Sequence, residues 1–169
     1  MSSTKTLFIV RHAKSSWDYE DISDVDRPLK HKGIRDAYEM ARRVKIERVI
    51  PELILSSPAI RALHTADIFT RVFEIKFAKL KIDGRIYGSG VGVIKKLIGE
   101  QDNKINRIMI FGHNPDFSEL ATVLSGKPYI DIPSCGLVRL DFDATIWESI
   151  SKDNLSAISF DFPRKENGY

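Results

Sequence analysis

Cysteine is almost missing from this chain. Cys135 is the one cysteine among 169 residues, so no disulfide can form within the chain. Disulfides belong mainly to oxidising compartments, and we therefore expect a cytoplasmic protein. The sequence also lacks any spacing of cysteine, histidine and acidic residues that is typical of metal ligands. We predict a protein that needs neither a metal ion nor another cofactor.

Long apolar runs are absent as well. No stretch approaches the roughly 20 apolar residues that a membrane-spanning helix needs. The first five residues lead directly into a predicted strand, which leaves no room for a signal peptide. We expect no association with a membrane.

A concentrated charge of one sign is the third absence. The chain has 26 Lys and Arg against 23 Asp and Glu, which gives a net charge of +3. Domains that bind nucleic acid usually present a dense basic face. The pairs Arg42-Arg43 and Lys95-Lys96 are better interpreted as solvated helix surface, so we expect no nucleic-acid partner.

The overall composition is that of an ordinary folded domain. Hydrophobic residues make up 43% and charged residues 29% of the chain. A length of 169 residues is enough for one substantial core. We predict a single domain over residues 1–169, with a polar, frayed tail at 163–169, that works as a monomer.

Strand-like and helix-like patterns alternate along the chain. Short apolar runs that predict strands lie at residues 6–10, 52–56, 79–82, 107–112, 137–142 and 156–162. Helical spacing of apolar residues lies between them, at residues 34–44, 59–73, 93–99 and 117–124. Ser57 and Pro58 predict the start of the second helix, as N-cap and first residue. This alternation predicts an α/β three-layer sandwich, with a mostly parallel sheet and helices on both faces.

Cationic and imidazole side chains recur at the ends of these strands. The first strand runs into Arg11 and His12, and the strand at 107–112 is followed by His113. The strand at 52–56 leads into a helix that carries Arg61 in its first turn. Because the carboxyl ends of parallel strands form the ligand crevice of an open sheet, we expect these four residues to converge.

This set of residue types is suited to phosphoryl transfer. Planar guanidinium groups bind phosphoryl oxygens through paired hydrogen bonds and stabilise their charge. A neutral imidazole can attack phosphorus and divide the transfer into two easier steps. A second, protonated imidazole would donate a further hydrogen bond to the phosphoryl oxygens.

The same residues resemble the motifs of a known family. Arg11-His12-Ala13 resembles the Arg-His-Gly signature of the histidine phosphatase superfamily, with alanine in place of glycine. Residues 56–66 resemble its second motif, and 112–115 resemble the third. The short length and the sequence at 26–29 are similar to the small phosphohistidine phosphatase branch. The resemblance implies a phosphoglycerate mutase-like fold.

The resemblance also implies roles for individual residues. His12 would be the phosphorylated nucleophile, and the phosphate pocket would be completed by Arg11, Arg61 and His113. Ser15 and Asp18 are further candidates for contact with the phosphate. A carboxylate repels phosphate, however, so Asp18 is expected to orient an arginine or to point elsewhere. His64 stands where glutamine is frequent and is interpreted as helix surface rather than as a substrate contact.

The general acid of the superfamily has no clear counterpart here. Asp83 and Asp116 are the candidates, and Asp116 could instead cap its helix. Imidazole leaves phosphorus more readily than an alkoxide does, so a missing acid favours phosphohistidine as substrate. The leading hypothesis is a phosphatase that acts on phosphohistidine of a protein such as a phosphotransfer domain. The alternatives are a phosphomonoesterase for small phosphate esters, or a phosphate-binding module with little turnover.

Overall fold

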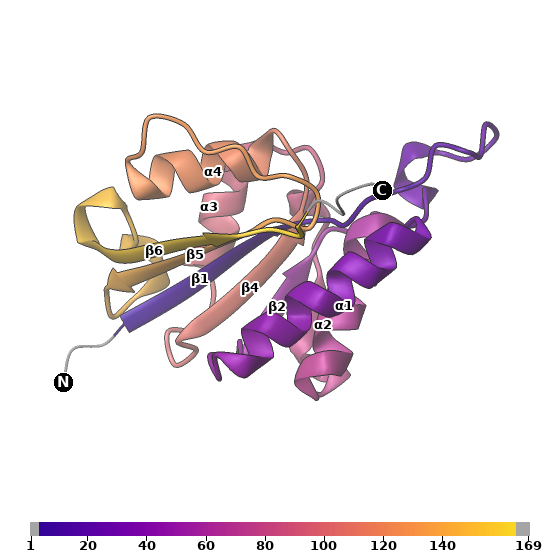
Figure 1. Cartoon of the computed structure of the whole chain (residues 1–169). Helices are drawn as coiled ribbons and strands as arrows, with labels where there is room; N and C mark the ends of the chain where they lie inside the picture. The colour runs from indigo at the N-terminus through magenta and orange to yellow at the C-terminus, as the bar shows by residue number, and fades with distance from the viewer. Residues whose placement is uncertain (1–3, 165–169) are drawn as a thin grey trace.

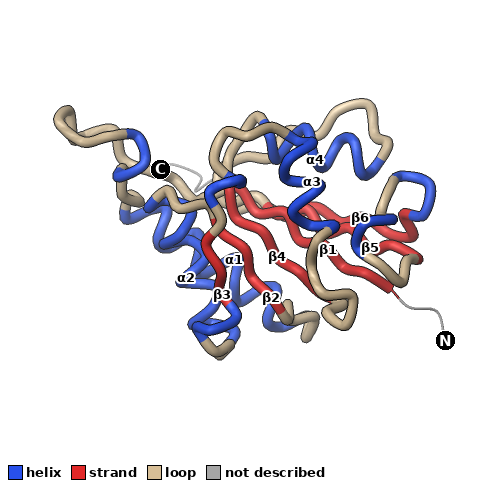
Figure 2. The backbone as a smooth tube through the Cα atoms, turned by 180° about the vertical axis from the view of Figure 1, so that it is seen from behind, coloured by secondary structure: helices blue, strands red, loops and turns tan. Residues whose placement is uncertain are grey.

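The computed structural model describes residues 4–164, so the terminal part of the predicted frayed tail, 165–169, lies outside the described residues. Figure 1 and Figure 2 show one central sheet with helices against each face. No helix within this described range is long and apolar enough to cross a bilayer.

The sheet is mixed and mostly parallel. Its strands, in spatial order, are β3 (Leu80–Ile82), β2 (Leu53–Ser56), β4 (Arg107–Gly112), β1 (Thr4–Arg11), β5 (Leu137–Asp143) and β6 (Leu155–Asp161). The first four pair in parallel, whereas β5 and β6 are antiparallel additions at one side. The α/β class and the mostly parallel sheet are confirmed.

Two helices cover each face. α1 (His31–Ile46) and α2 (Ile60–Phe73) lie on one side, and α3 (Val91–Gly99) and α4 (Asp116–Ser125) lie on the other (Figure 1). Side chains of β1 alternate between the two resulting cores: Leu7 and Ile9 pack with α3 and α4, while Phe8 and Val10 pack with α1 and α2. Because both faces of β1 are buried between these cores, its middle part, residues 7–10, is an unbroken apolar run.

The predicted start of α2 is wrong by two residues. Ala59 is the N-cap, and the helix begins at Ile60. The Ser57 hydroxyl oxygen accepts a hydrogen bond from the Ala59 backbone N–H at 3.2 Å, so it closes the turn before the helix. The turn keeps Ser57 at the sheet edge, where its hydroxyl lies 2.8 Å from Nε2 of His113.

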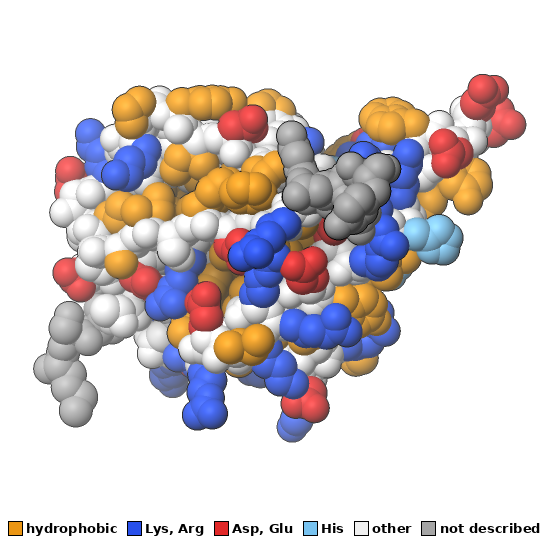
Figure 3. Space-filling view, viewed as in Figure 1, with side chains coloured by type: hydrophobic (Ala, Val, Ile, Leu, Met, Phe, Trp, Pro, Cys, Tyr) orange, Lys and Arg blue, Asp and Glu red, His pale blue; other side chains and the backbone are white. Residues whose placement is uncertain are grey.

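Residues 16–28 form an arm that projects beyond the carboxyl edge of the sheet, next to α1 (Figure 1). At its base, the Ser16 N–H donates to the Pro28 carbonyl at 2.8 Å. Its tip is exposed and acidic, as the space-filling view shows (Figure 3). Gly33 of α1 fits under this base because a Cβ there would lie 2.3 Å from the Lys14 carbonyl oxygen.

Candidate active site

Arg11, His12, Arg61 and His113 meet at the carboxyl edge of the sheet, as their strand-end positions predict. Arg11 ends β1, and the backbone N–H of His12 donates to the Gly112 carbonyl at 3.0 Å. The ring centroids of His12 and His113 lie 5.2 Å apart. Arg61 is buried in the first turn of α2, close enough for its positive charge to lower the pKa of both histidines.

His12 is held in one neutral tautomer. Its Nδ1 atom lies 2.7 Å from the Ala13 carbonyl oxygen, and a carbonyl can only accept, so Nδ1 carries the proton. Burial, together with the charges of Arg61 and Arg11, lowers the pKa of His12 to about 4. At neutral pH the ring is therefore uncharged, and Nε2 presents a free lone pair.

Three buried side-chain nitrogens of this site have no hydrogen-bond partner within residues 4–164. They are Nε of Arg11, Nε of Arg61 and Nδ1 of His113. Leaving a buried polar group unpaired costs about 1–3 kcal/mol, so such groups are rare without a functional reason. Two cationic donors and an imidazole nitrogen at one place form a pocket that fits an oxyanion.

Terminal nitrogens of both arginines donate hydrogen bonds within the protein. Nη1 of Arg11 donates to the Ile132 carbonyl at 3.0 Å. Nη1 and Nη2 of Arg61 donate to the backbone oxygen and a carboxylate oxygen of Asp24, at 2.6 and 2.9 Å. Arg61 is thereby held through both terminal nitrogens and Arg11 through one, while the Nε atom of each stays without a partner within residues 4–164.

A third arginine, Arg27, belongs to the same cluster. It is buried, and its positive charge also lowers the pKa of His12. Nη1 donates to the Ser15 hydroxyl at 2.9 Å, and the guanidinium lies 3.5 Å from the Trp17 ring centroid. Ser15, predicted to contact the phosphate, is thus the partner of Arg27. Sequence reasoning used the stretch 26–29 for the resemblance without assigning Arg27 a role.

The predicted arginine-orienting role belongs to a different aspartate. Asp18 is exposed on the arm, and its backbone N–H donates to the Ser16 hydroxyl at 3.1 Å. Asp24, six residues further along the arm, is the residue that holds Arg61. His64 is half-buried on α2, three residues after Arg61.

The two candidate general acids are committed elsewhere. Asp83 accepts from the backbone N–H and the guanidinium of Arg85, and these bonds lower its pKa. Asp116 accepts from the Gly90 N–H at 3.1 Å. It does not cap α4, because the cap bond to the Ser118 N–H comes from the Asn114 side chain.

Thr65 joins two of the sequence motifs. Its hydroxyl oxygen accepts from the Ala13 N–H at 3.1 Å and its O–H donates to the Arg61 carbonyl at 2.7 Å. The residue after the histidine is therefore tied to the turn of α2 that carries Arg61. The link holds the backbone of Ala13 at its N–H, and the carbonyl of the same residue fixes the tautomer of His12.

Tyr87 forms part of the wall of the site and was not identified from sequence. Its hydroxyl donates to the Asp24 carboxylate at 2.6 Å, and this bond raises the pKa of the tyrosine. Its ring meets the His113 ring edge-on, with 5.3 Å between centroids. No pattern around residue 87 indicates this role, because it depends on contact with a residue 63 positions away.

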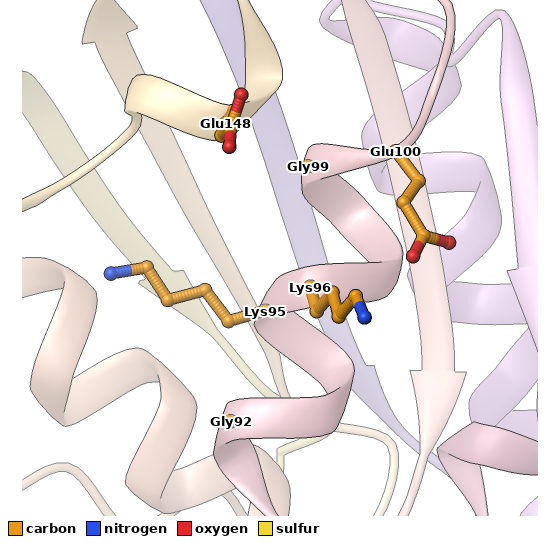
Figure 4. A pocket seen from close by; sticks show the side chains of 6 residues that line it. All are labelled: Gly92, Lys95, Lys96, Gly99, Glu100 and Glu148. Atoms are coloured by element: carbon orange, nitrogen blue, oxygen red, sulfur yellow. The ribbon is translucent and has the colours of Figure 1, made fainter.

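A separate hollow of about 520 Å³ lies between α3 and residues 147–149 (Figure 4). It is lined by Gly92, Lys95, Lys96, Gly99, Glu100 and Glu148. Lys95 and Lys96 point to opposite sides of the helix, so their ammonium groups do not converge on one ligand. The Glu100 carboxylate is paired with Arg85 at 2.8 Å. The chemistry of the molecule is therefore concentrated at the sheet edge.

Potential metal ligands do not cluster in the described part of the chain. Among residues 4–164 there is no group of three or more histidine, cysteine or acidic side chains that could hold a metal ion. The site is instead built from guanidinium and imidazole groups, which are donors to anions.

Comparison with known proteins agrees with this site. Residues 7–114 match the profile of the histidine phosphatase superfamily, branch 1. The chain belongs to this superfamily, and the protein is a phosphatase of the hydrolase class.

Relatives in sequence extend across most of the chain. A chloroplastic, uncharacterised protein of Arabidopsis thaliana is 31% identical over 155 residues, which cover 87% of this chain and 71% of the relative. An uncharacterised protein of Mycobacterium tuberculosis is 27% identical over 165 residues, covering 92% of this chain and all of the relative.

Solved structures agree with the predicted small branch. A protein from Agrobacterium tumefaciens, provisionally designated phosphohistidine phosphatase SixA, superposes with a TM-score of 0.78 at 26% identity, over 95% of this chain and 99% of that one. The protein histidine phosphatase SixA in complex with tungstate gives a TM-score of 0.77 at 21% identity, over 93% and 94%. These similarities confirm the phosphoglycerate mutase-like fold and the SixA-like branch.

Proposed function

We propose that this phosphatase removes the phosphoryl group from phosphohistidine on a protein, through a phosphorylated His12. One observation carries the proposal: a neutral His12 with a free Nε2 belongs to the same site as three buried side-chain nitrogens that lack partners within residues 4–164. The provisional designation of the Agrobacterium tumefaciens relative as a phosphohistidine phosphatase supports the choice of substrate.

The unpaired donors are the proposed phosphate site. Nε of Arg11, Nε of Arg61 and Nδ1 of His113 would each donate to a phosphoryl oxygen. The two guanidinium groups counter the charge that the oxygens carry in the transition state. His113 is neutral before substrate arrives, since burial and the proximity of His12 lower its pKa to about 3. Its Nδ1 can donate while Nε2 accepts from the Ser57 hydroxyl, at 2.8 Å.

The reaction proceeds in two displacements. Nε2 of His12 attacks phosphorus, and the bond between phosphorus and the substrate imidazole nitrogen breaks with its electron pair going to that nitrogen. The proton stays on Nδ1, which keeps donating to the Ala13 carbonyl, so the new phosphohistidine on the enzyme is held in place. Water then attacks phosphorus, inorganic phosphate leaves, and His12 returns to its neutral form.

The state of the carboxylates supports phosphohistidine over phosphate esters. An alkoxide leaving group needs a proton from a general acid, whereas an imidazole leaves far more readily. Asp83 is ionised by its bonds to Arg85, and Asp116 is bonded to the Gly90 N–H. Neither carboxylate is placed as a free acid beside the histidines.

A comparison of substrates tests the proposal. We expect kcat/KM for a phosphohistidine phosphotransfer domain to exceed that for sugar phosphates and phosphoserine peptides by at least about 100-fold, or about 2.7 kcal/mol. His12→Asn should abolish turnover, while His31→Asn, at the exposed start of α1, should not. Equal activity on a phosphate ester would indicate that the protein is a phosphomonoesterase for small phosphate esters. Phosphate binding without turnover would indicate a phosphate-binding module.

The setting of the site supports two further proposals. All four groups around the proposed phosphate site come from one chain, so a monomer in a single domain is sufficient for activity. Burial raises the pKa of the single cysteine, Cys135, well above its usual value, which leaves an inert thiol that requires no oxidising compartment. We propose that the protein acts in the cytoplasm.

A further inference from the structure

The Asp24 carboxylate is the point where three segments of the chain meet. Its side-chain oxygens accept from Nη2 of Arg61 at 2.9 Å, from Nε of Arg27 at 3.0 Å and from the Tyr87 hydroxyl at 2.6 Å. Its backbone oxygen accepts from Nη1 of Arg61 at 2.6 Å. These donors come from α2, from the base of the arm and from the turn before α3.

The two hydrogen bonds that Arg61 donates to Asp24 determine which Arg61 nitrogen remains available to a ligand. Together they occupy both terminal nitrogens of the guanidinium, so the planar group cannot rotate without losing one of them. Nε of Arg61 is left buried and unpartnered within residues 4–164. An arginine held in this way meets an oxyanion through Nε at a defined position, rather than through its flexible terminal fork.

This arrangement has an electrostatic cost. The bonds from Tyr87, Arg61 and Arg27 hold the pKa of Asp24 well below its usual range, so the carboxylate is ionised at neutral pH. A fixed negative charge on the far side of Arg61 opposes the binding of a phosphate dianion. Asp24 therefore fixes the position of Arg61 and, at the same time, weakens the affinity of the site for phosphate.

We propose that Asp24 is a positioning residue, which fixes Arg61 for the transfer step while weakening the affinity of the pocket for phosphate. The inference rests on the proposed function, since it assumes that Nε of Arg61 receives a phosphoryl oxygen. Because Asp24 lies on the arm, the placement of the arm and the placement of Arg61 form one unit. Tyr87 closes this unit from the opposite side, between Asp24 and His113.

The variant Asp24→Asn tests this role because it keeps the shape and removes the charge. We expect kcat on a phosphohistidine protein to fall at least about tenfold, since Arg61 keeps its bond to the backbone oxygen of residue 24 but loses the ion pair that aligns it for the transition state. We expect the Kd of inorganic phosphate, measured by calorimetry, to fall about threefold, since a repelling charge is lost. Damage to the fold would instead weaken phosphate binding and turnover together, and this outcome would overturn the inference.

Two further variants distinguish the positioning effect of Asp24 from the effect of its negative charge. Asp21→Asn removes the same charge from the exposed tip of the arm and should change neither kcat nor the Kd of phosphate. Tyr87→Phe keeps the Asp24 charge and removes one bond to it, so kcat should fall about threefold with the Kd of phosphate unchanged. If Asp21→Asn reproduces the effect of Asp24→Asn, the effect is one of net charge and the positioning role is wrong.

The same measurements distinguish failure of the inference from failure of the proposed function. If the wild-type protein neither binds inorganic phosphate nor loses turnover in His12→Asn, the proposed function fails. If the wild type binds phosphate and depends on His12, but Asp24→Asn leaves kcat and Kd unchanged, only the role of Asp24 fails.

Discussion

The side-chain Nδ1 of His12 and the carbonyl oxygen of Ala13 are 2.7 Å apart, and this contact selects the nitrogen that can react. The carbonyl accepts a hydrogen bond from Nδ1, which therefore carries the proton, so the lone pair is on Nε2. Ala13 occupies the position of a glycine in the superfamily motif, and its backbone alone makes the contact. The substitution therefore leaves the chemistry of His12 intact.

The first prediction concerns the phosphorylated nitrogen. A trapped phosphoenzyme should carry phosphorus on Nε2 of His12, which is identified by nitrogen and phosphorus NMR because the two phosphohistidine isomers differ in chemical shift. His12→Ala should retain its fold and less than about a hundredth of wild-type kcat/KM. Phosphorus on Nδ1 would contradict the tautomer that the Ala13 contact implies.

The second prediction concerns the shape of the Arg61 side chain. Lysine keeps the positive charge but loses the planar fork that binds Asp24 and presents Nε. Arg61→Lys should lower kcat at least about 100-fold, as measured by phosphate release under saturating phosphohistidine substrate. Arg71→Lys, in the last turn of the same helix, is the matched control and should be silent. A silent Arg61→Lys would remove Arg61 from the site.

The third prediction is that the free energy of unfolding decreases as the pH is lowered, because of His12. Its pKa is about 4 in the folded protein against an ordinary 6.5, so between these values the unfolded chain binds a proton that the folded chain does not. This contribution is fully present above pH 6.5 and is lost as the pH falls toward 4. It amounts to about 2 kcal/mol between pH 7 and pH 5.

Urea unfolding of the wild type and of His12→Asn at these two pH values measures the contribution directly. The wild type should lose about 2 kcal/mol more than the variant on going from pH 7 to pH 5. His113 is present in both proteins, so its own lowered pKa cancels from the difference to first order. An equal loss in both proteins would mean that His12 titrates like an exposed histidine.

The fourth prediction concerns the link between the motifs. Thr65→Val removes the oxygen that accepts the Ala13 N–H, so kcat should fall about tenfold and stability by about 1–2 kcal/mol. Thr65→Ser should restore both. Thr70 makes the same bond to the carbonyl four residues earlier in the same helix, but it does not contact the histidine motif. Thr70→Val should therefore lower stability without a specific loss of kcat.

The sequence by itself determined the elements and the edge at which the chemistry lies. The period of the hydrophobic pattern and the length of the apolar runs distinguish the buried strands from the helices. Parallel strands must end at the same edge of a sheet. Arg11, His12 and His113 follow from these rules because each lies directly at a strand end. Arg61 follows from its place in the first turn of the next helix.

Only the tertiary structure decided how these groups are held. Asp24 and Arg61 are 37 residues apart, and Tyr87 and Asp24 are 63 apart, so no local pattern relates them. The arm that carries Asp24 has no period from which its path could be predicted, and its acidic residues look alike in sequence. For the same reason Ser57 was predicted to be a helix cap, when its hydroxyl also faces His113 across the sheet edge. Strand ends are fixed by backbone geometry, whereas the partners of an arginine are fixed by which distant side chains the fold brings within 3 Å of it.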